Sequence, residues 1–313
     1  MKFLTTDLIA REALMVLRNN AVMANLVHRD YSDEFVAGVG DTITIRKPAS
    51  FEAKEFSGSI AVQDANETGV PVKMDKFLDV SFAVTSQQLS MEIEDFSKQL
   101  LVPAMQAFAN KVDALLLGLK ADVTNNVPAT ADVQNDVIDA RAYLTKNAAP
   151  LADRRFVYGS DIETKLLKVK GFTEADKVGD EGTALREASL GRKYGMDFYV
   201  DQNADTADVA GMAFHKNAFA FVTRPLALPL GAAKASIVDY DGFGLRVVQS
   251  YDINTKTDII SIDMVCGVKT LDPKLAAVID GTAEAAIMDE DQPAAYDPDA
   301  NGEGADNGAN AGE

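Results

Sequence analysis

Residues 86–120 read SQQLSMEIEDFSKQLLVPAMQAFANKVDALLLGLK, and this stretch decides the fold. Its apolar residues recur every three or four positions, which places them on one face of a helix. They are Leu89, Ile93, Phe96, Leu100, Ala104, Phe108, Val112, Leu115 and Leu119. The intervening polar residues, Asp113 among them, fall mostly on the opposite, wet face. One continuous helix would run about 50 Å at 1.5 Å per residue, a length that suits a spine. Pro103 predicts a kink at 102–103, or a second helix beginning there, because proline lacks a backbone N–H.

The segments before this helix predict a shorter helix and a hairpin. Residues 5–27 have helical apolar spacing, which predicts an N-terminal helical arm or, alternatively, a core helix. Alternating residues at 42–47 and again at 70–85 predict two strands, with the polar stretch 51–69 between them. We interpret 41–85 as a long two-stranded arm with a flexible tip. Because an isolated hairpin is marginal in water, this arm needs another surface on which to lie.

The segments after the helix predict a mixed α/β region and a closing pair of strands. Asp132 can cap a helix at 133–147. A strand at 155–159 precedes a helix at 161–169, whose start has a capping-box pattern at Ser160. The other predicted elements are a loop at 171–192, a strand at 195–200, strand and helix candidates at 212–222, and antiparallel strands at 245–251 and 258–269.

Composition divides the chain into an ordinary body and an acidic end. The 313 residues are 47% apolar and 25% charged, which is ordinary for a protein with one or two buried cores. Ten acids and no lysine or arginine lie within 280–313, so these residues contribute −10 of the formal charge of −18 and leave −8 for 1–279. We predict a disordered acidic tail at 280–313. Tight nucleic-acid binding is not expected, since it needs clustered Lys and Arg.

Cysteine use and hydropathy predict a cytoplasmic protein. Cys266 is the single cysteine, which excludes an intrachain disulfide and fits a reducing compartment. Asp7, Arg11 and Glu12 interrupt any apolar signal-peptide core. No run approaches membrane-spanning length, so we expect no membrane association.

Motifs for nucleotide chemistry are incomplete where they occur. The tripeptide HRD at 28–30 matches the start of a kinase catalytic loop, but Phe35 stands where the metal-binding Asn belongs. The Gly-Val-Gly sequence at 38–40 opens a strand and has Ile43 in place of a third glycine, so it predicts a turn and not a phosphate cradle.

Metal and nucleophile sites are also incomplete. Zinc would have only His28, His215 and Cys266 as its usual ligands, and each is more simply a surface or core residue. Ser160 lies at a strand-to-helix turn but lacks the flanking glycines of a nucleophile elbow, so a helix cap explains it better. Residues 297–302 match the first half of a calcium loop whose twelfth position lacks the bidentate Glu. We predict no catalytic, cofactor-binding or metal-binding residue.

Several phrases of this sequence resemble the major coat proteins of tailed bacteriophages, in particular the podovirus coat-protein family. The resemblance covers residues 1 to about 279. It rests on IAREALMVLRNNAVMANLVHRDYSDEF (9–35), GVGDTITIRKP (38–48), VSFAVTSQQLSMEIEDFSKQLLVPAMQAFANKVDALLLGL (80–119), GRKYGMDFYVDQN (191–203), AFHKNAFAFVTRPL (213–226) and the closing strands.

The resemblance implies an α+β phage major capsid fold of the Hong Kong ninety-seven type. The implied parts are an N-terminal arm at 1–40, an extended hairpin loop at 41–85, the peripheral-domain spine helix at 86–129, an axial domain at 130–243, closing strands of the peripheral domain at 244–279, and the tail at 280–313. Residues 130–240 leave little space for the extra inserted domain of the best-known podovirus coat proteins.

The implied function is structural and not enzymatic. Hexamers and pentamers of the subunit would form an icosahedral shell that encloses double-stranded DNA without sequence-specific binding. Scaffolding and portal proteins are implied partners, with assembly in the host cytoplasm and a final place in the virion. Arg11, Arg18 and Arg29 could meet an acidic scaffolding partner. The alternatives are an encapsulin-like cargo shell and, in a different class, a cytoplasmic α/β enzyme with an unrecognised carboxylate site.

Overall fold

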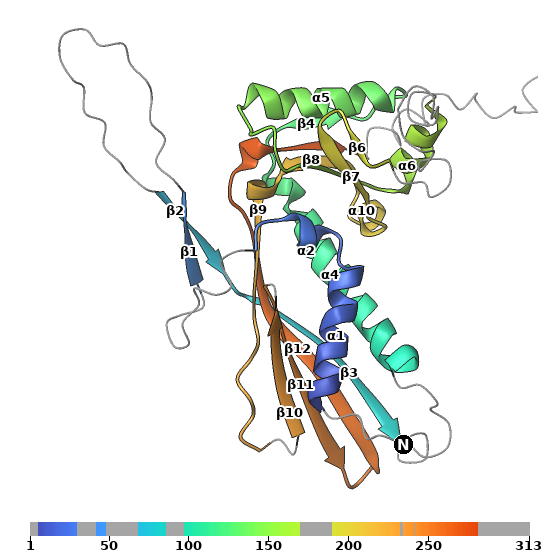
Figure 1. Cartoon of the computed structure of the whole chain (residues 1–313), viewed down its shortest axis with the longest axis vertical. Helices are drawn as coiled ribbons and strands as arrows, with labels where there is room; N and C mark the ends of the chain where they lie inside the picture. Colours follow the sequence, from blue (N-terminus) through green and yellow to red (C-terminus); the bar gives the residue numbers. More distant parts are fainter. Residues whose placement is uncertain are drawn as a thin grey trace, which may run out of the picture.

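The chain forms a five-stranded and a six-stranded sheet with helices packed against them, and a separate two-stranded sheet (Figure 1). They are described here from a computed structural model for residues 6–29, 42–47, 68–85, 97–169, 190–231, 234–240 and 242–280. The lower sheet of Figure 1 has the order β10-β11-β12-β3, and β9 also pairs with β12. Its strands are β3 (Lys76–Thr85), β9 (Phe219–Arg224), β10 (Lys234–Tyr240), β11 (Phe243–Asp252) and β12 (Thr257–Thr270).

The upper sheet has six strands in the order β4-β13-β8-β5-β7-β6. They are β4 (Asn126–Pro128), β5 (Arg154–Tyr158), β6 (Arg192–Lys193), β7 (Met196–Val200), β8 (Val209–His215) and β13 (Ala276–Asp280). Its pairings are mixed, because β5 runs parallel to β7 and antiparallel to β8. The sheets therefore exchange strands along the sequence: β9 and β10 join the lower sheet after the upper-sheet strand β8, and β13 returns to the upper sheet after β12.

The predicted spine helix is confirmed from residue 97 onward, and 86–96 lie outside the described residues. A π-helical turn, Ser97–Leu101, leads into α4 (Val102–Leu117), and a 3-10 turn, Gly118–Asp122, follows. Pro103 lies in the first turn of α4, next to the preceding π-helical turn, where the helical hydrogen-bond pattern changes. The predicted irregularity at 102–103 is thus a change from π-helix to α-helix.

The buried face of α4 belongs to the largest core of the protein. Met105, Phe108, Val112 and Leu116 are all at most 1% exposed. By length and composition alone, Gln99–Asp122 could cross a membrane, so the prediction that no run reaches that length was wrong. Its packing against α1 (Thr6–Asn20), α2 (Met23–Leu26) and α10 (Asn203–Thr206) identifies it as a core helix.

The N-terminal segment folds onto the same core. α1 (Thr6–Asn20) packs against α4, β10 and β11 through a buried face that includes Ile9, Ala13 and Leu17. Of the two alternatives for 5–27, the core helix is therefore confirmed. A short helix, α2 (Met23–Leu26), follows and packs on α4.

The hairpin differs from its predicted form. β1 (Thr42–Lys47) pairs with β2 (Thr68–Lys73), but the prediction that 70–85 returns along the first strand holds only to Lys73. The continuation, β3, leaves the hairpin and pairs antiparallel along β12. The reason is that β12 offers β3 ten residues of hydrogen-bonding edge in the lower sheet. Residues 48–67, between β1 and β2, lie outside the described part of the chain.

The base of the hairpin rests on the body. Ile43, Ile45 and Val72 are buried in a small cluster with Val222 and Leu271. At Gly267 of β12 an added Cβ would lie 2.5 Å from the carbonyl oxygen of Lys73, so β2 passes close over β12. The predicted need of the hairpin for a supporting surface is met at its base by β9 and β12.

The remaining predicted elements are mostly confirmed. α5 is Val133–Lys146, and the Asp132 carboxylate accepts hydrogen bonds from the N–H groups of Gln134 and Asn135, as a cap should. Strands β5, β7, β11 and β12 lie where strands were predicted. Residues 212–222 form no α-helix: they supply parts of β8 and β9, with a 3-10 turn at Lys216–Ala218.

Removal of the Phe108 ring should destabilise the whole protein. Phe108 is 1% exposed on α4, so Phe108→Ala should lower the free energy of unfolding by about 3–5 kcal/mol, measured by urea denaturation of the unassembled chain. Phe77→Ala is the matched control, because Phe77 is 65% exposed on β3 and its loss should cost less than about 1 kcal/mol. Equal costs for the two variants would contradict the assignment of α4 to the core.

Candidate functional site

A buried carboxylate joins the N-terminal segment to the spine. Asp113 of α4 is 1% exposed, although the sequence pattern placed it among residues of the wet face. Its Oδ2 accepts a hydrogen bond from the Val22 N–H at 2.8 Å, and its Oδ1 accepts one from the Ala24 N–H at 3.2 Å. These N–H groups lie at the start of α2 and have no helical partner of their own. Asp113 therefore holds α2 against α4.

Burial changes the proton affinity of this carboxylate. Removal from water raises the pKa of Asp113 from 3.8 to about 7, and the hydrogen bonds from the α2 backbone oppose that rise. The nearby Asp201 carboxylate also raises the pKa of Asp113 by charge repulsion. Asp201 lies at the end of β7, is 1% exposed, and has a pKa that is itself raised by burial. Asp201 is thus close enough to Asp113 for the two carboxylates to repel each other.

The neutral form of Asp113 should stabilise the fold. Its pKa is higher in the folded chain than in the unfolded chain, so the folded state binds more protons between about pH 4 and pH 7. The free energy of unfolding should therefore decrease as the pH rises from about 4 to about 7. Above about pH 7, Asp113 should no longer contribute this stabilisation.

An Asn at this position cannot titrate and tests that expectation. The free energy of unfolding of the parent chain minus that of Asp113→Asn should decrease by on the order of 1–4 kcal/mol from about pH 4 to about pH 8. Urea denaturation at several pH values measures this difference. A difference that increased with pH would show that Asp113 is ionised in the folded chain.

Ser160 does not act as the predicted capping residue. The cap position of α6 (Ser160–Lys168) is Gly159, and Ser160 is the first helical residue. Asp205, from the short helix α10 (Asn203–Thr206), supplies the cap: its carboxylate accepts from the Ser160 N–H at 3.1 Å and from the Ser160 Oγ–H at 2.6 Å. The local pattern failed because the capping group lies 45 residues away in sequence. The Ser160 hydroxyl is thus a hydrogen-bond donor to the carboxylate that caps its own helix.

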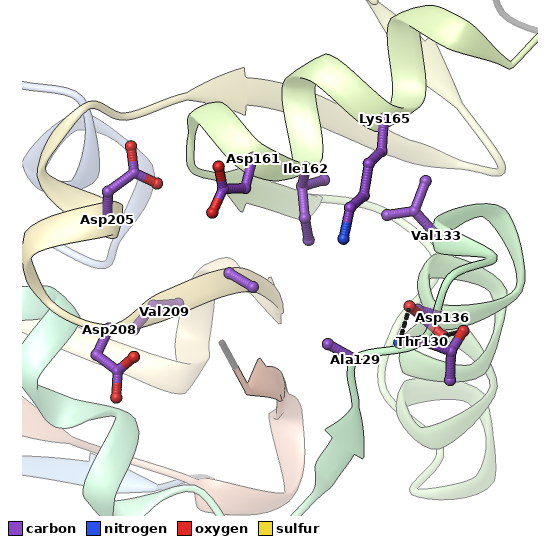
Figure 2. Close-up of a pocket in the computed structure, with 11 residues that line it drawn as sticks. Ala129, Thr130, Val133, Asp136, Asp161, Ile162, Lys165, Asp205, Asp208 and Val209 are labelled. Atoms are coloured by element: carbon purple, nitrogen blue, oxygen red, sulfur yellow. Dashed lines mark hydrogen bonds between the residues drawn. The ribbon is translucent and has the colours of Figure 1, made fainter. Parts of the chain in front are cut away.

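A small hollow beside this cap is too confined for an organic substrate. It has a volume of about 110 Å³, whereas small-molecule sites usually exceed about 300 Å³. Figure 2 shows the Lys165 side chain extending into it, with Asp161 and Asp205 at one end and Asp136 at the other. Asp136 is engaged by the Thr130 N–H at 2.9 Å and its hydroxyl at 2.7 Å. These carboxylates hold the ends of helices, and the hollow has room for a few water molecules.

The Asp205 carboxylate can reach the start of α6 only if the residue before Ser160 has no side chain. An added Cβ at Gly159 would overlap the Asp205 carboxylate, so Gly159→Ala should displace the cap and lower the free energy of unfolding by about 1–3 kcal/mol. Thermal and urea denaturation measure the effect. At Gly118, where a Cβ would meet nothing within 4 Å, Gly118→Ala should be neutral or slightly stabilising. If Gly159→Ala left the free energy of unfolding unchanged, this would contradict the assignment of Asp205 as the cap of α6.

The three residues considered as zinc ligands lie on different elements. His28 forms an isolated bridge with Ala220. His215 ends β8, where its Nδ1 accepts from the Asn217 N–H and burial lowers its pKa. Cys266 is fully buried in β12, and burial raises its thiol pKa to about 12. Among the described residues, no group of three or more His, Cys, Asp or Glu could hold a metal ion. The glycines at 38–40 and the stretch 297–302 lie outside those residues.

The three arginines considered for a scaffolding partner have contacts within the chain. Arg11 pairs with Asp7 on the exposed side of α1 at 3.2 Å. The guanidinium carbon of Arg18 lies 4.7 Å from the centre of the Tyr240 ring, and that of Arg29 lies 5.0 Å from the centre of the Phe243 ring. The scaffolding contact remains a prediction.

Comparison with known proteins identifies the fold. No protein-family model and no curated protein matches the sequence. A solved structure from Mycobacterium phage Che8 has a TM-score of 0.62 at 21% identity and covers 84% of this chain and 92% of that chain. The capsid structure of the cyanophage P-SCSP1u has a TM-score of 0.53 at 15% identity, over 77% of this chain and 83% of that chain. The chain has a phage capsid fold.

A third match extends the same result. The mature capsid of bacteriophage PhiM1 has a TM-score of 0.53 at 13% identity, over 78% of this chain and 82% of that chain. The predicted fold class, an α+β phage capsid fold, is therefore confirmed. At such identities the likeness is one of fold, carried by the arrangement of elements and not by shared side chains.

Proposed function

We propose that this chain is a major capsid protein whose copies assemble into a closed icosahedral shell around double-stranded DNA. The observation that carries the proposal is the fold, which is shared over about four-fifths of the chain with the P-SCSP1u and PhiM1 capsid structures. The carboxylates described above support a structural role, because Asp113 and Asp205 bind backbone N–H groups of this chain and face no substrate-sized cavity.

The proposal includes the finer features implied by the sequence resemblance. The shell would be of the Hong Kong ninety-seven type, built from hexamers and pentamers with scaffolding and portal proteins as partners. It would assemble in the host cytoplasm and persist in the virion. The lower sheet with α1 and α4 is our candidate for the peripheral domain, and the upper sheet with α5 and α6 is our candidate for the axial domain.

These proposed domains modify the expected boundaries. β10 lies within 130–243 but pairs with β11 of the lower sheet, and β13 lies within 244–279 but pairs with β8 of the upper sheet. β9 also lies within 130–243 and pairs with β12 of the lower sheet. We therefore propose that each domain is discontinuous in sequence, with β9 and β10 in the peripheral domain and β13 in the axial domain.

Exposed apolar side chains support contacts between copies. Phe77 is 65% exposed, Ile253 is 76% exposed, and Leu230 is fully exposed. Large apolar side chains in such positions supply surface that neighbouring subunits can bury. Many modest contacts of this kind, repeated by symmetry, can stabilise a shell.

Electron microscopy of the purified full-length chain tests the proposal. Negative staining, with and without co-expressed scaffolding and portal proteins, should show closed shells of uniform diameter. Shells that form in the complete system should contain DNA protected from nuclease. Monomers or small oligomers under both conditions would overturn the capsid assignment, and shells that enclose a protein cargo instead of DNA would favour the encapsulin-like alternative.

A further inference from the structure

A groove with lysines on its walls lies between the hairpin base and the spine. It has a volume of about 500 Å³ and is lined by the β2–β3 connection, the C-terminal part of α4 and the end of β12. Leu115, Leu119 and Val268 contribute half-buried apolar surface. Lys73, Lys76 and Lys269 line the same groove. The combination suits a ligand that carries both apolar groups and negative charge.

The charge of this groove is opposite to that of the chain. The described residues that line it include three lysines and one acid, Asp75, whereas the whole chain has a formal charge of −18. The Lys76 Nζ lies 3.4 Å from Asp75, but both side chains are nearly half exposed, so this pair is weak. The groove is therefore a local cationic site on an anionic protein.

The terminal segment 281–313 has the complementary chemistry. It contains nine acids and no lysine or arginine. Ile287 and Met288 directly precede three acids in the run IMDED. A segment of this kind can place two apolar side chains on an apolar surface while its carboxylates meet lysines.

The chain connection brings this segment within reach. Lys269 lines the groove, and β13 ends eleven residues later at Asp280. Eleven residues span at most about 40 Å, so the segment begins within that distance of the groove. Residues 281–313 follow Asp280 directly and are long enough, when extended, to cover this distance. Attachment of a segment to the chain that carries its binding site raises its effective concentration at that site, to the millimolar range for short linkers. Binding within one chain is therefore favoured over binding between copies in dilute solution.

We propose that the groove binds the acidic segment 281–313 of the same chain, with Lys73, Lys76 and Lys269 facing its carboxylates. The IMDED run occupies the apolar part of the groove. This interaction is a property of the single subunit and does not depend on the capsid assignment.

Fluorescence anisotropy of the labelled segment tests the proposal in the full-length chain. A dye attached through Ala294→Cys reports the motion of the segment, because the buried Cys266 thiol does not compete for the label in the folded chain. The measurement uses concentrations at which sedimentation shows the unassembled subunit. A docked segment gives high anisotropy that falls as salt rises from about 0.05 to 0.5 M, since salt screens exposed charges.

Paired variants locate the contact. Lys73→Glu, Lys76→Glu and Lys269→Glu together should lower the docking equilibrium constant about tenfold or more, because three ion pairs worth up to about 1 kcal/mol each become repulsive. The control changes three exposed lysines elsewhere, Lys111→Glu, Lys146→Glu and Lys168→Glu, and alters net charge equally. It should leave the anisotropy close to that of the parent chain.

A second set of changes avoids any effect on folding of the body. Asp289→Asn, Glu290→Gln and Asp291→Asn should release the segment as the groove variant does. The proposal fails if the groove and segment variants retain the parent anisotropy, or if the control variant lowers it as much. Anisotropy that fell on dilution would identify a second copy as the occupant and would contradict binding within one chain. Failure of shell formation under the microscope would leave this measurement unaffected.

Discussion

The hydrogen bonds from the N-terminal segment to Asp113 are the interaction on which the arrangement of this molecule depends. A carboxylate inside an apolar core must be protonated or hydrogen-bonded, and Asp113 meets that requirement with the Val22 and Ala24 N–H groups. The chain beyond α2 then reaches both sheets. Arg155 of β5 donates to the Leu26 carbonyl oxygen, and His28 exchanges backbone hydrogen bonds with β9. One buried polar contact thus fixes the segment that ties the spine to both sheets.

β12 is the second organising element. It is 14 residues long, and β11 and β3 pair with its two edges from Thr257 onward. Its last residues, Val265–Thr270, pair with β9. Its close approach to β2 at Gly267 places the base of the β1–β2 hairpin on the body (Figure 1).

The fold persists at identities near 15–20% to the matched capsid structures because the pattern of burial, and not particular side chains, specifies it. The surface is free to differ. In this chain the surface combines a strongly acidic terminal segment with a groove that carries three lysines. Neither feature is needed to build the two sheets, and both are open to selection for interactions of the subunit.

The sequence by itself determined the elements whose cause is local. The apolar spacing of 97–120 predicted the spine helix, Asp132 predicted the start of α5, and alternation predicted β11 and β12. These elements are predictable because periodic burial and short-range hydrogen bonds depend on residues that are close together in sequence. Tertiary structure alone decided that β3 leaves the hairpin for β12, that Asp205 caps α6 in place of Ser160, and that Asp113 lies inside. One signal for Asp113 was present, since it stands between the buried Ala109 and Leu117, four residues from each. Its partners are about 90 residues away, and no local pattern can specify which distant N–H groups a folded chain brings to a carboxylate.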